Sequence, residues 1–130
     1  MEHNIREIVV IDPSPLSCKI LSVALQRAGY RVRCFTESRE ALRTLFHEGD
    51  PPPDLIFVTL NLPSPQLGGL KSIQLLRKHF IDLPILSIGD SAKGQVLPRL
   101  LARLAGANAF VSKPFIVDHI VATVTTLLPP

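Results

Sequence analysis

The stretch "PDLIFVTLNLP", residues 53–63, decides the expected fold. Residues 55–60 form a short, continuously apolar run, which is typical of a strand covered on both faces of a sheet. The prolines at 51–53 predict a stiff loop before it, because proline continues neither a helix nor a central strand. This is the most hydrophobic of the predicted strands, so we place it at the centre of the sheet. The polar residue at its exit is Thr59.

Strand and helix patterns alternate along the whole chain. The expected strands are residues 7–12, 31–35, 55–60, 84–88 and 109–112, and the expected helices are residues 15–28, 37–48, 68–80, 98–105 and 115–128. Strict alternation with short loops predicts a parallel sheet with helices on both faces. Functional residues are then expected at the carboxyl ends of the strands, where such sheets form their crevice.

The helices carry recognisable ends and apolar stripes. Ser14 is the expected N-cap of the first helix, Pro15 suits its first position, and Gly29 is expected to stop it. In the third helix, the residues expected to face inward are Leu70, Ile73, Leu76 and Phe80. In the fourth, the expected apolar stripe consists of Leu97, Leu100, Leu101 and Leu104, with Arg99 and Arg103 pointing elsewhere.

Length and hydropathy predict one soluble domain spanning residues 1–130. The chain has 130 residues, of which 46% are hydrophobic, which is enough to bury a core. No apolar run approaches the ~18–20 residues that a membrane-spanning helix needs. The N-terminus carries charges where a signal peptide needs its apolar centre. We therefore expect a cytoplasmic protein.

Charge and aromatic content argue against nucleic-acid binding by this domain alone. The net charge is +3, but the arginines are scattered, as with Arg31 and Arg33 on one strand face. Aromatic residues are 5% of the chain and tryptophan is absent, so the elements that stack on bases are missing.

Cysteines and histidines do not predict a metal site. The four histidines, His3, His47, His79 and His119, lack metal-ligand spacing. Cys18 falls in a helix and Cys34 in a strand, and we interpret both as small core residues in a reducing compartment. Nothing in the sequence specifies a disulfide between them.

Five segments in order resemble the receiver domain of two-component response regulators, over nearly the whole chain. They are "IVVID" (8–12), "AGY" (28–30), "PDLIFVTLNLP" (53–63), "LPILSI" (83–88) and "AGANAFVSKPF" (105–115). The last is the most specific, because few other families combine a Gly-Ala turn, a short strand and Lys-Pro-Phe. The resemblance implies a doubly wound, flavodoxin-like α/β fold with strand order 2-1-3-4-5.

The resemblance also implies a site. In that family a histidine kinase phosphorylates an aspartate at the end of the third strand. Two acidic residues after the first strand help to hold Mg²⁺, and a hydroxyl and a lysine contact the phosphoryl oxygens. By position in this sequence, Lys113 is that lysine, Pro114 follows it as the candidate cis-proline, and Phe110 is the switch aromatic.

Three positions depart from the family pattern. Thr59 stands at the acceptor position, Pro13 replaces the second acid and leaves Asp12 alone, and Gly89 stands at the hydroxyl position. Phosphoryl transfer needs a carboxylate nucleophile and a cation, and no base is evident beside Thr59 in the sequence. Mg²⁺ also prefers carboxylate ligands. The sequence therefore predicts a pseudo-receiver with no enzyme activity, no cofactor, and Mg²⁺ binding that is lost or very weak.

The lysine and the aromatic each have two interpretations. Lys113 is expected to pair with Asp12 across the vestigial pocket, since an isolated ammonium there would be poorly compensated. Its alternative is an anion site with backbone N–H groups near Gly89. Phe110 is most simply a half-buried core aromatic, and its alternative is a two-state gate.

If the pocket is not phosphorylated, the function is expected to depend on binding at the outer surfaces. The resemblance points to the face of the fourth helix, fifth strand and fifth helix, where Arg99, Arg103, Asp118 and His119 lie. We expect a protein partner or a homodimer there, with Arg meeting Asp across a two-fold axis, although a plain solvated surface would look the same. A longer chain could add a C-terminal output domain.

Two alternatives differ in class from this phosphorylation-independent interaction module. One is a receiver still phosphorylated at a displaced acceptor, for which Asp90 and Asp54 are the nearby acids, although neither stands at the exit of the third strand. Ser87, two residues before Gly89, is the hydroxyl nearest to the family's hydroxyl position. The other is an unrelated small α/β ligand-binding domain, which no nucleophile–base pair or Gly-rich phosphate loop supports.

Overall fold

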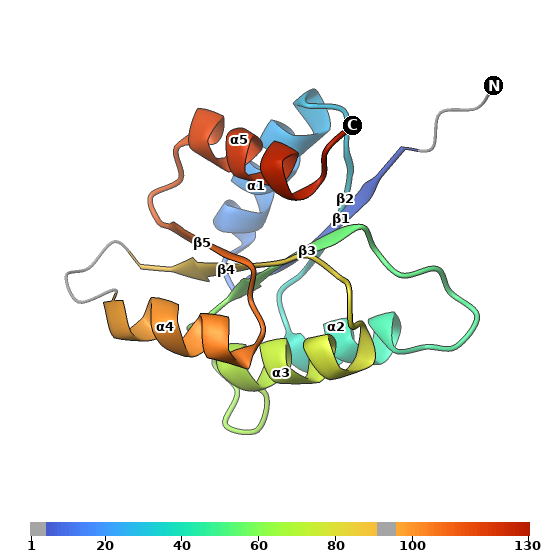
Figure 1. Ribbon diagram of the computed structural model, residues 1–130, viewed down its shortest axis with the longest axis vertical. Coiled ribbons are helices and arrows are strands. Elements are labelled where there is room, and N and C mark those ends of the chain that lie inside the picture. Colours follow the sequence, from blue (N-terminus) through green and yellow to red (C-terminus); the bar gives the residue numbers. More distant parts are fainter. Residues whose placement is uncertain (1–4, 91–95) are drawn as a thin grey trace.

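A five-stranded parallel sheet forms the centre of the protein, in a computed structural model that describes residues 5–90 and 96–130. The strands are β1 (Glu7–Ile11), β2 (Arg31–Phe35), β3 (Leu55–Thr59), β4 (Ile85–Gly89) and β5 (Ala109–Ser112). Their order in the sheet is β2-β1-β3-β4-β5, which confirms the expected topology and the central place of β3 (Figure 1). His3 and most of the loop after Asp90 lie outside the described residues.

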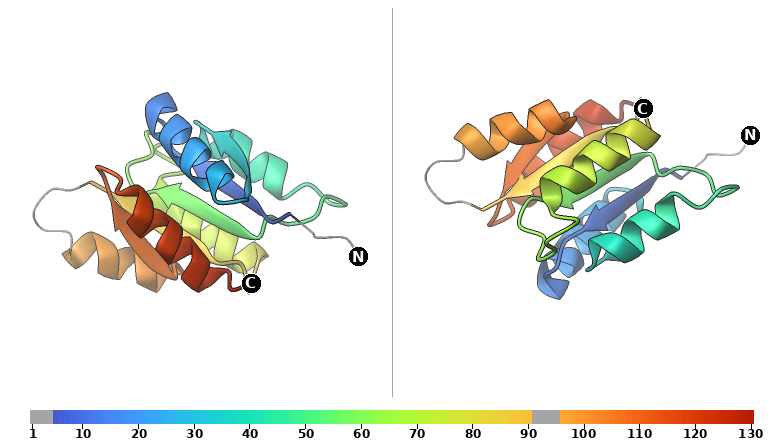
Figure 2. Two further views of the ribbon diagram at one scale, coloured as in Figure 1. Left: turned by 90° about the horizontal axis from the view of Figure 1, so that it is seen from above. Right: turned by 90° about the horizontal axis from the view of Figure 1, so that it is seen from below.

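Helices cover both faces of the sheet. One face carries α1 (Pro15–Arg27) and α5 (Val117–Leu127), and the other carries α2 (Ser38–Leu45), α3 (Gly69–His79) and α4 (Val96–Ala105), as Figures 1 and 2 show. Within residues 5–90 and 96–130, no helix combines the length and the apolar character needed to cross a bilayer. The fold is thus the doubly wound α/β sandwich that the sequence predicts.

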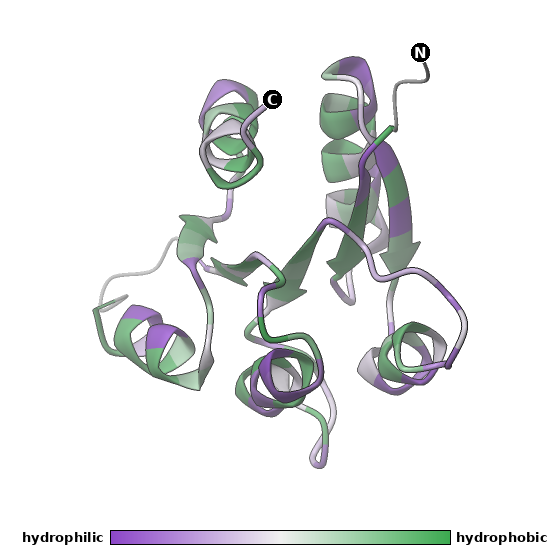
Figure 3. Cartoon of the chain, turned by 45° about the vertical axis from the view of Figure 1, so that its right-hand side comes forward, coloured by the Kyte–Doolittle hydropathy of each residue, from purple (hydrophilic) through white to green (hydrophobic). Residues whose placement is uncertain are grey.

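The two cores explain the unbroken apolar runs of the strands. Successive side chains of a strand point to opposite faces, so Ile8 and Val10 enter the core under α1 and α5, and Val9 and Ile11 enter the other. Every residue of β3 is buried. Figure 3 shows the central strands in the hydrophobic colour and hydrophilic bands on the edge strand β2. A strand buried on both faces has no polar side to display.

Several helix boundaries and orientations differ from expectation. The second helix ends at Leu45 rather than at residue 48, and the left-handed turn at Gly49 (φ 92°) lies beyond its end. In α3, Leu70 faces solvent, because the residues that pack inward are Ser72, Ile73 and Leu76. Ser14 caps α1 as expected, its hydroxyl accepting a hydrogen bond from the backbone N–H of Ser17.

The fourth helix starts earlier than expected and presents its apolar stripe to solvent. It begins at Val96 rather than at Pro98, and its leucines face solvent, with Leu97 61% and Leu104 74% exposed. Within residues 96–105, all of which are described, Ala102 is the one buried residue. Periodicity identifies an apolar face of a helix, but it does not say what covers that face.

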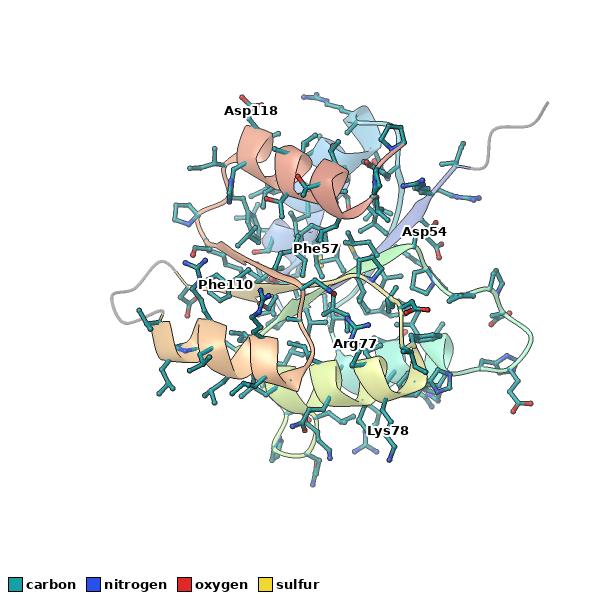
Figure 4. All side chains as sticks on the ribbon, in the orientation of Figure 1. Asp54, Phe57, Arg77, Lys78, Phe110 and Asp118 are labelled. Carbon is teal, nitrogen blue, oxygen red and sulfur yellow. The ribbon has the colours of Figure 1, made fainter. Side chains whose placement is uncertain are left out.

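Arg77 ties α3 to the segment that leads into β5. Its guanidinium donates hydrogen bonds to the carbonyl oxygens of Gly106, Phe80 and Ile81, and to Oδ1 of Asn108. Asn108 Oδ1 also accepts from the backbone N–H of Ile85, which connects the same cluster to β4. These bonds fix α3 and the starts of β4 and β5 relative to one another, around Arg77 (Figure 4).

The start of α3 lies against the exit of β3. A Cβ atom added at Gly69 would lie 2.4 Å from Leu60 Cα and 2.6 Å from the carbonyl oxygen of Thr59, which are both backbone atoms. At the neighbouring Gly68, the nearest atom to such a Cβ is the Ser64 carbonyl oxygen, at 3.7 Å. Of these two positions, Gly69 requires glycine, because only there does the backbone of α3 lie too close to the end of β3 for a Cβ atom.

We expect Gly69→Ala to lower the free energy of unfolding by about 1–3 kcal/mol, because the backbone of β3 has to move to admit the methyl group. Urea denaturation followed by circular dichroism measures the change. Gly68→Ala is the matched control, and it should alter stability by at most about 0.5 kcal/mol. Equal effects of the two substitutions would contradict the close-approach explanation.

Candidate functional site

A fully buried carboxylate, that of Asp12, forms the centre of the site. Lys113 Nζ lies 2.9 Å from its Oδ2 and 3.2 Å from its Oδ1. The Thr59 hydroxyl donates a hydrogen bond of 2.5 Å to Oδ2. The backbone N–H of Ser14 donates to Oδ1 at 2.8 Å. The pairing of Lys113 with Asp12 expected from the sequence is therefore present, and Thr59 joins it.

The sheet brings these three side chains together from distant parts of the sequence. Asp12 directly follows β1, Thr59 ends β3, and Lys113 directly follows β5. Parallel strands present their carboxyl ends at one edge, so the three residues meet there. Between them stands Gly89 at the end of β4, which contributes no side chain and accepts the backbone N–H of Lys113 at 2.8 Å.

These contacts occupy the acceptor capacity of the Asp12 carboxylate. An ionised carboxylate offers about four lone-pair positions. Each oxygen of Asp12 receives the Lys113 ammonium and one further donor, Thr59 on Oδ2 and Ser14 on Oδ1. A buried charge is costly unless it is paired and hydrogen-bonded, and this one is both.

The structure corrects one expectation about Thr59, because a base does lie beside it. Its hydroxyl hydrogen points to Asp12, which the sequence could not reveal, since 47 residues separate the two. Thr59 is only 4% exposed, so its oxygen has little access to solvent. The local chemistry is a closed hydrogen bond between a buried hydroxyl and a carboxylate that is already paired with Lys113.

The remaining residues named for the pocket do not join this cluster through any contact of the described residues. Pro13 is half-buried and brings no polar side-chain atom. The Ser87 hydroxyl is buried and donates to the Ala109 carbonyl at 3.1 Å, so it serves the β4–β5 pair instead. Asp54 lies at the opposite end of β3, where its Oδ2 accepts the Glu7 backbone N–H at 2.7 Å (Figure 4).

Sequence reasoning missed Asn61 beside the pocket. Its Nδ2 donates to Asp90 Oδ2 at 2.5 Å, which joins the loop after β3 to the loop after β4. The available signal was its position, since it is a polar residue two places after Thr59 at the active edge of the sheet.

Phe110 lies beneath α4 rather than in the pocket. It is half-buried on β5, and the guanidinium carbon of Arg99 lies 5.2 Å from its ring centroid, within cation–π range. A hollow of about 380 Å³ separates α4 from the sheet here, and its lining includes Arg99, Arg103 and Ser87. After β5, the Lys113–Pro114 peptide bond is cis, as the resemblance implies.

The other two residues named for the surface lie on α5. Asp118 occupies the first turn of α5, where a negative charge suits the helix dipole, and both Asp118 and His119 are exposed. Asp118 and Phe110 are far apart in Figure 4, on opposite sides of the edge strand β5. The described face thus has basic residues on α4 and an acidic one on α5.

Comparison with known proteins identifies the family to which this chain belongs. The family model described as "Response regulator receiver domain" matches residues 8–125. This chain belongs to the response regulator receiver family. The alternative of an unrelated α/β domain was therefore wrong, and the resemblance noted from the sequence is confirmed.

Solved receiver structures share the fold. A putative response regulator from Chloroflexus aurantiacus superposes with a TM-score of 0.85 at 26% identity, covering 98% of this chain and 100% of its own. The receiver domain of NtrX from Brucella abortus gives 0.83 at 25% identity, covering 93% and 97%. A longer NtrX chain gives 0.85 at 24% identity, and this chain spans only 27% of it.

We expect Lys113→Met to destabilise the receiver by about 2–3 kcal/mol, because it leaves the buried Asp12 carboxylate without its cation. This is below the range for a fully buried pair, since 26% of the Lys113 side chain is exposed. Chemical denaturation measures the loss. Lys78→Met, on the exposed outer side of α3, is the control and should change stability by at most about 0.5 kcal/mol.

A double-mutant cycle with Asp12→Asn isolates the interaction. The double variant should be more stable than the sum of the two single effects predicts, by at least about 1 kcal/mol. Strict additivity would show that Lys113 does not stabilise the protein through Asp12.

Proposed function

We propose that this receiver domain acts as a phosphorylation-independent interaction module in two-component signalling. The observation that carries the proposal is the Asp12 carboxylate, whose two oxygens are fully engaged by Lys113, Thr59 and the Ser14 backbone. A pocket whose acid is already neutralised by its own lysine has no charge left to organise phosphoryl transfer. Under this proposal the domain is not an enzyme and works inside the cell.

Thr59 is a poor phosphoacceptor for two structural reasons. Thr59 is 4% exposed, so a phosphodonor cannot approach its hydroxyl in line without local opening. Its neighbouring base, Asp12, is already paired with Lys113 at 2.9 Å and accepts hydrogen bonds on both oxygens. Activation of an alcohol nucleophile needs the opposite, a base that is free to accept it.

Magnesium does not fit the donor set. The ion prefers an octahedron of oxygen ligands that includes one or two carboxylates. Here Pro13 stands where a second carboxylate would stand, and the Lys113 ammonium contacts both oxygens of the one that remains. Among residues 5–90 and 96–130, no three His, Cys, Asp or Glu side chains are grouped to hold a metal.

Acetyl phosphate supplied with Mg²⁺ should leave the intact mass of the protein unchanged, because no carboxylate lies at the acceptor position. A receiver with the complete acidic set serves as the positive control in the same incubation. A stable adduct, or turnover of acetyl phosphate above the blank, would contradict the proposal. The Asp90→Asn variant then decides between a displaced acceptor at Asp90, which loses the adduct, and another site, which keeps it.

We further propose that the face formed by α4, β5 and α5 binds a second copy of this chain. Leucines that normally belong in a core project from α4 into solvent, with Leu97, Leu100, Leu101 and Leu104 all exposed. Contiguous exposed apolar residues rimmed by charge mark interaction surfaces in soluble proteins.

Charge complementarity favours a second copy as the occupant. The α4 side of the face carries Arg99 and Arg103, and the α5 side carries Asp118. A two-fold contact is self-complementary, so α4 of each copy can meet α5 of the other and pair Arg with Asp twice. The apolar stripe would then be covered by association rather than by the sheet.

Sedimentation velocity over a concentration series should show reversible dimers, and Leu104→Glu should weaken them at least tenfold in Kd, about 1.4 kcal/mol. Ile81→Glu is the matched control, since Ile81 is 79% exposed in the loop after α3, and it should leave the dimer unchanged. Combining Arg103→Asp with Asp118→Arg should restore association that either change alone weakens. A wild-type protein that stays monomeric throughout would overturn the second copy as the occupant.

A further inference from the structure

The two cysteines of the chain lie against each other, although they come from different elements. Cys18 belongs to α1 and Cys34 to β2, the edge strand beside β1. The Cys34 thiol donates to the backbone oxygen of Cys18 at 3.7 Å, and the Ser22 hydroxyl, one turn further along α1, lies 3.1 Å from the same sulfur. Both belong to the described part of the chain and both are reduced.

The surroundings make the two sulfurs unequal. Cys18 is 6% exposed, and its Sγ lies 3.5 Å from the backbone oxygen of Asp12. Cys34 is half-buried, so solvent reaches it, and the Ser22 hydroxyl lies 3.1 Å from its sulfur. Cys34 thus has a hydroxyl neighbour that can donate to a thiolate, and it has an accessible side.

Their acidities follow from these contacts. The neighbouring Cys18 side chain, and after it the Ser22 hydroxyl, lower the pKa of Cys34, against the opposing effects of burial and the Asp12 charge. The nearby Cys34 side chain and burial raise the pKa of Cys18, and Asp12 adds to the increase while Lys113 opposes it. Cys34 is therefore the more acidic and the more accessible of the two thiols, as an attacking thiol should be.

We propose that Cys34 and Cys18 form a thiol–disulfide site, in which a peroxide oxidises Cys34 and Cys18 resolves the product. The Cys34 thiolate attacks one peroxide oxygen, the O–O bond breaks, and the departing hydroxide takes a proton and leaves as water. Cys34 is then a sulfenic acid. The Cys18 sulfur attacks it, forming the S–S bond and breaking the S–O bond, and the hydroxyl leaves with the Cys18 proton as a second water. The two sulfurs supply the two electrons that reduce the peroxide.

A disulfide between Cys18 and Cys34 would form close to the Asp12 pocket. Oxidation would tie α1 to β2 covalently and remove the Cys18 thiol hydrogen that faces the Asp12 carbonyl at 3.5 Å. Asp12 itself begins the loop between β1 and α1, so the disulfide would form next to the segment that holds the buried carboxylate. Disulfides in reducing compartments are commonly transient and redox-sensing, which suits a half-buried attacking thiol that solvent can reach.

The experiment treats the full chain with hydrogen peroxide at neutral pH, blocks remaining thiols with iodoacetamide and measures intact mass. With only two cysteines in the chain, the count of alkyl groups is unambiguous. The wild type should lose both alkylation sites without forming a disulfide to a second chain, and it should regain both sites after dithiothreitol. Cys18→Ala should instead trap Cys34 as a dimedone-reactive sulfenic acid, and Cys34→Ala should leave Cys18 unoxidised.

The alkylation rate of Cys34 at pH 6 provides a second, independent reading. Because its pKa is lowered, Cys34 is more often the thiolate at this pH, so it should react at least about fivefold faster than an unperturbed thiol, even with its lower intrinsic nucleophilicity. Ser22→Ala and Cys18→Ala should each move the rate toward the slower value, with circular dichroism confirming the fold. Retention of both free thiols in the oxidised wild type, linkage only between chains, or equal reactivity of Cys18 and Cys34 would each overturn the proposal.

Discussion

The buried charge of Asp12 is the constraint on which the rest of the structure depends. A carboxylate that is fully removed from water must be compensated, and the nearest cation is Lys113, which arrives from the far side of β3 and β4. This pairing links the segment after β5 to the segment after β1 across the ends of β3 and β4, and the Thr59 hydroxyl gives Asp12 a further donor. In a receiver with several acids, the same lysine would face a surplus of negative charge. Here one acid meets one lysine, and the pocket is neutral and closed.

Because the Asp12 carboxylate is already paired with Lys113, the face formed by α4, β5 and α5 is the second feature to consider for binding. The helix α4 has one buried residue and a hollow beneath it, so its leucines are not packed against the sheet. Phe110 is covered on that side by Arg99, which links the edge of the sheet to the charged part of the same face. The basic α4 and the acidic start of α5 then have a simple physical reading as two halves of one association surface.

Much of the fold could be predicted because its signals are local. A strand buried on both faces, such as β3, has an unbroken apolar run, and Ser14 and Pro15 mark the start of α1 by chemistry that needs no tertiary context. The expectation that Thr59 stands at the family's acceptor position came from the family pattern alone. The contacts that bring Asp12 to Thr59 and Cys18 to Cys34 could not be predicted, because residues far apart in the chain meet only through the strand order. The apolar stripe of α4 was predicted but its exposure was not, because an apolar helix face has the same period whether a sheet or a partner covers it.

The arginines of β2 have one further consequence. Its free side is a row of unpaired backbone groups, which in many proteins recruits strands from other molecules and seeds fibrils. Arg31 and Arg33 place cations along that edge, and Arg33 is held there by Glu7 at 3.1 Å. Growth of the sheet by pairing of one β2 with another would bring these like charges together, so β-type aggregation is disfavoured from this side.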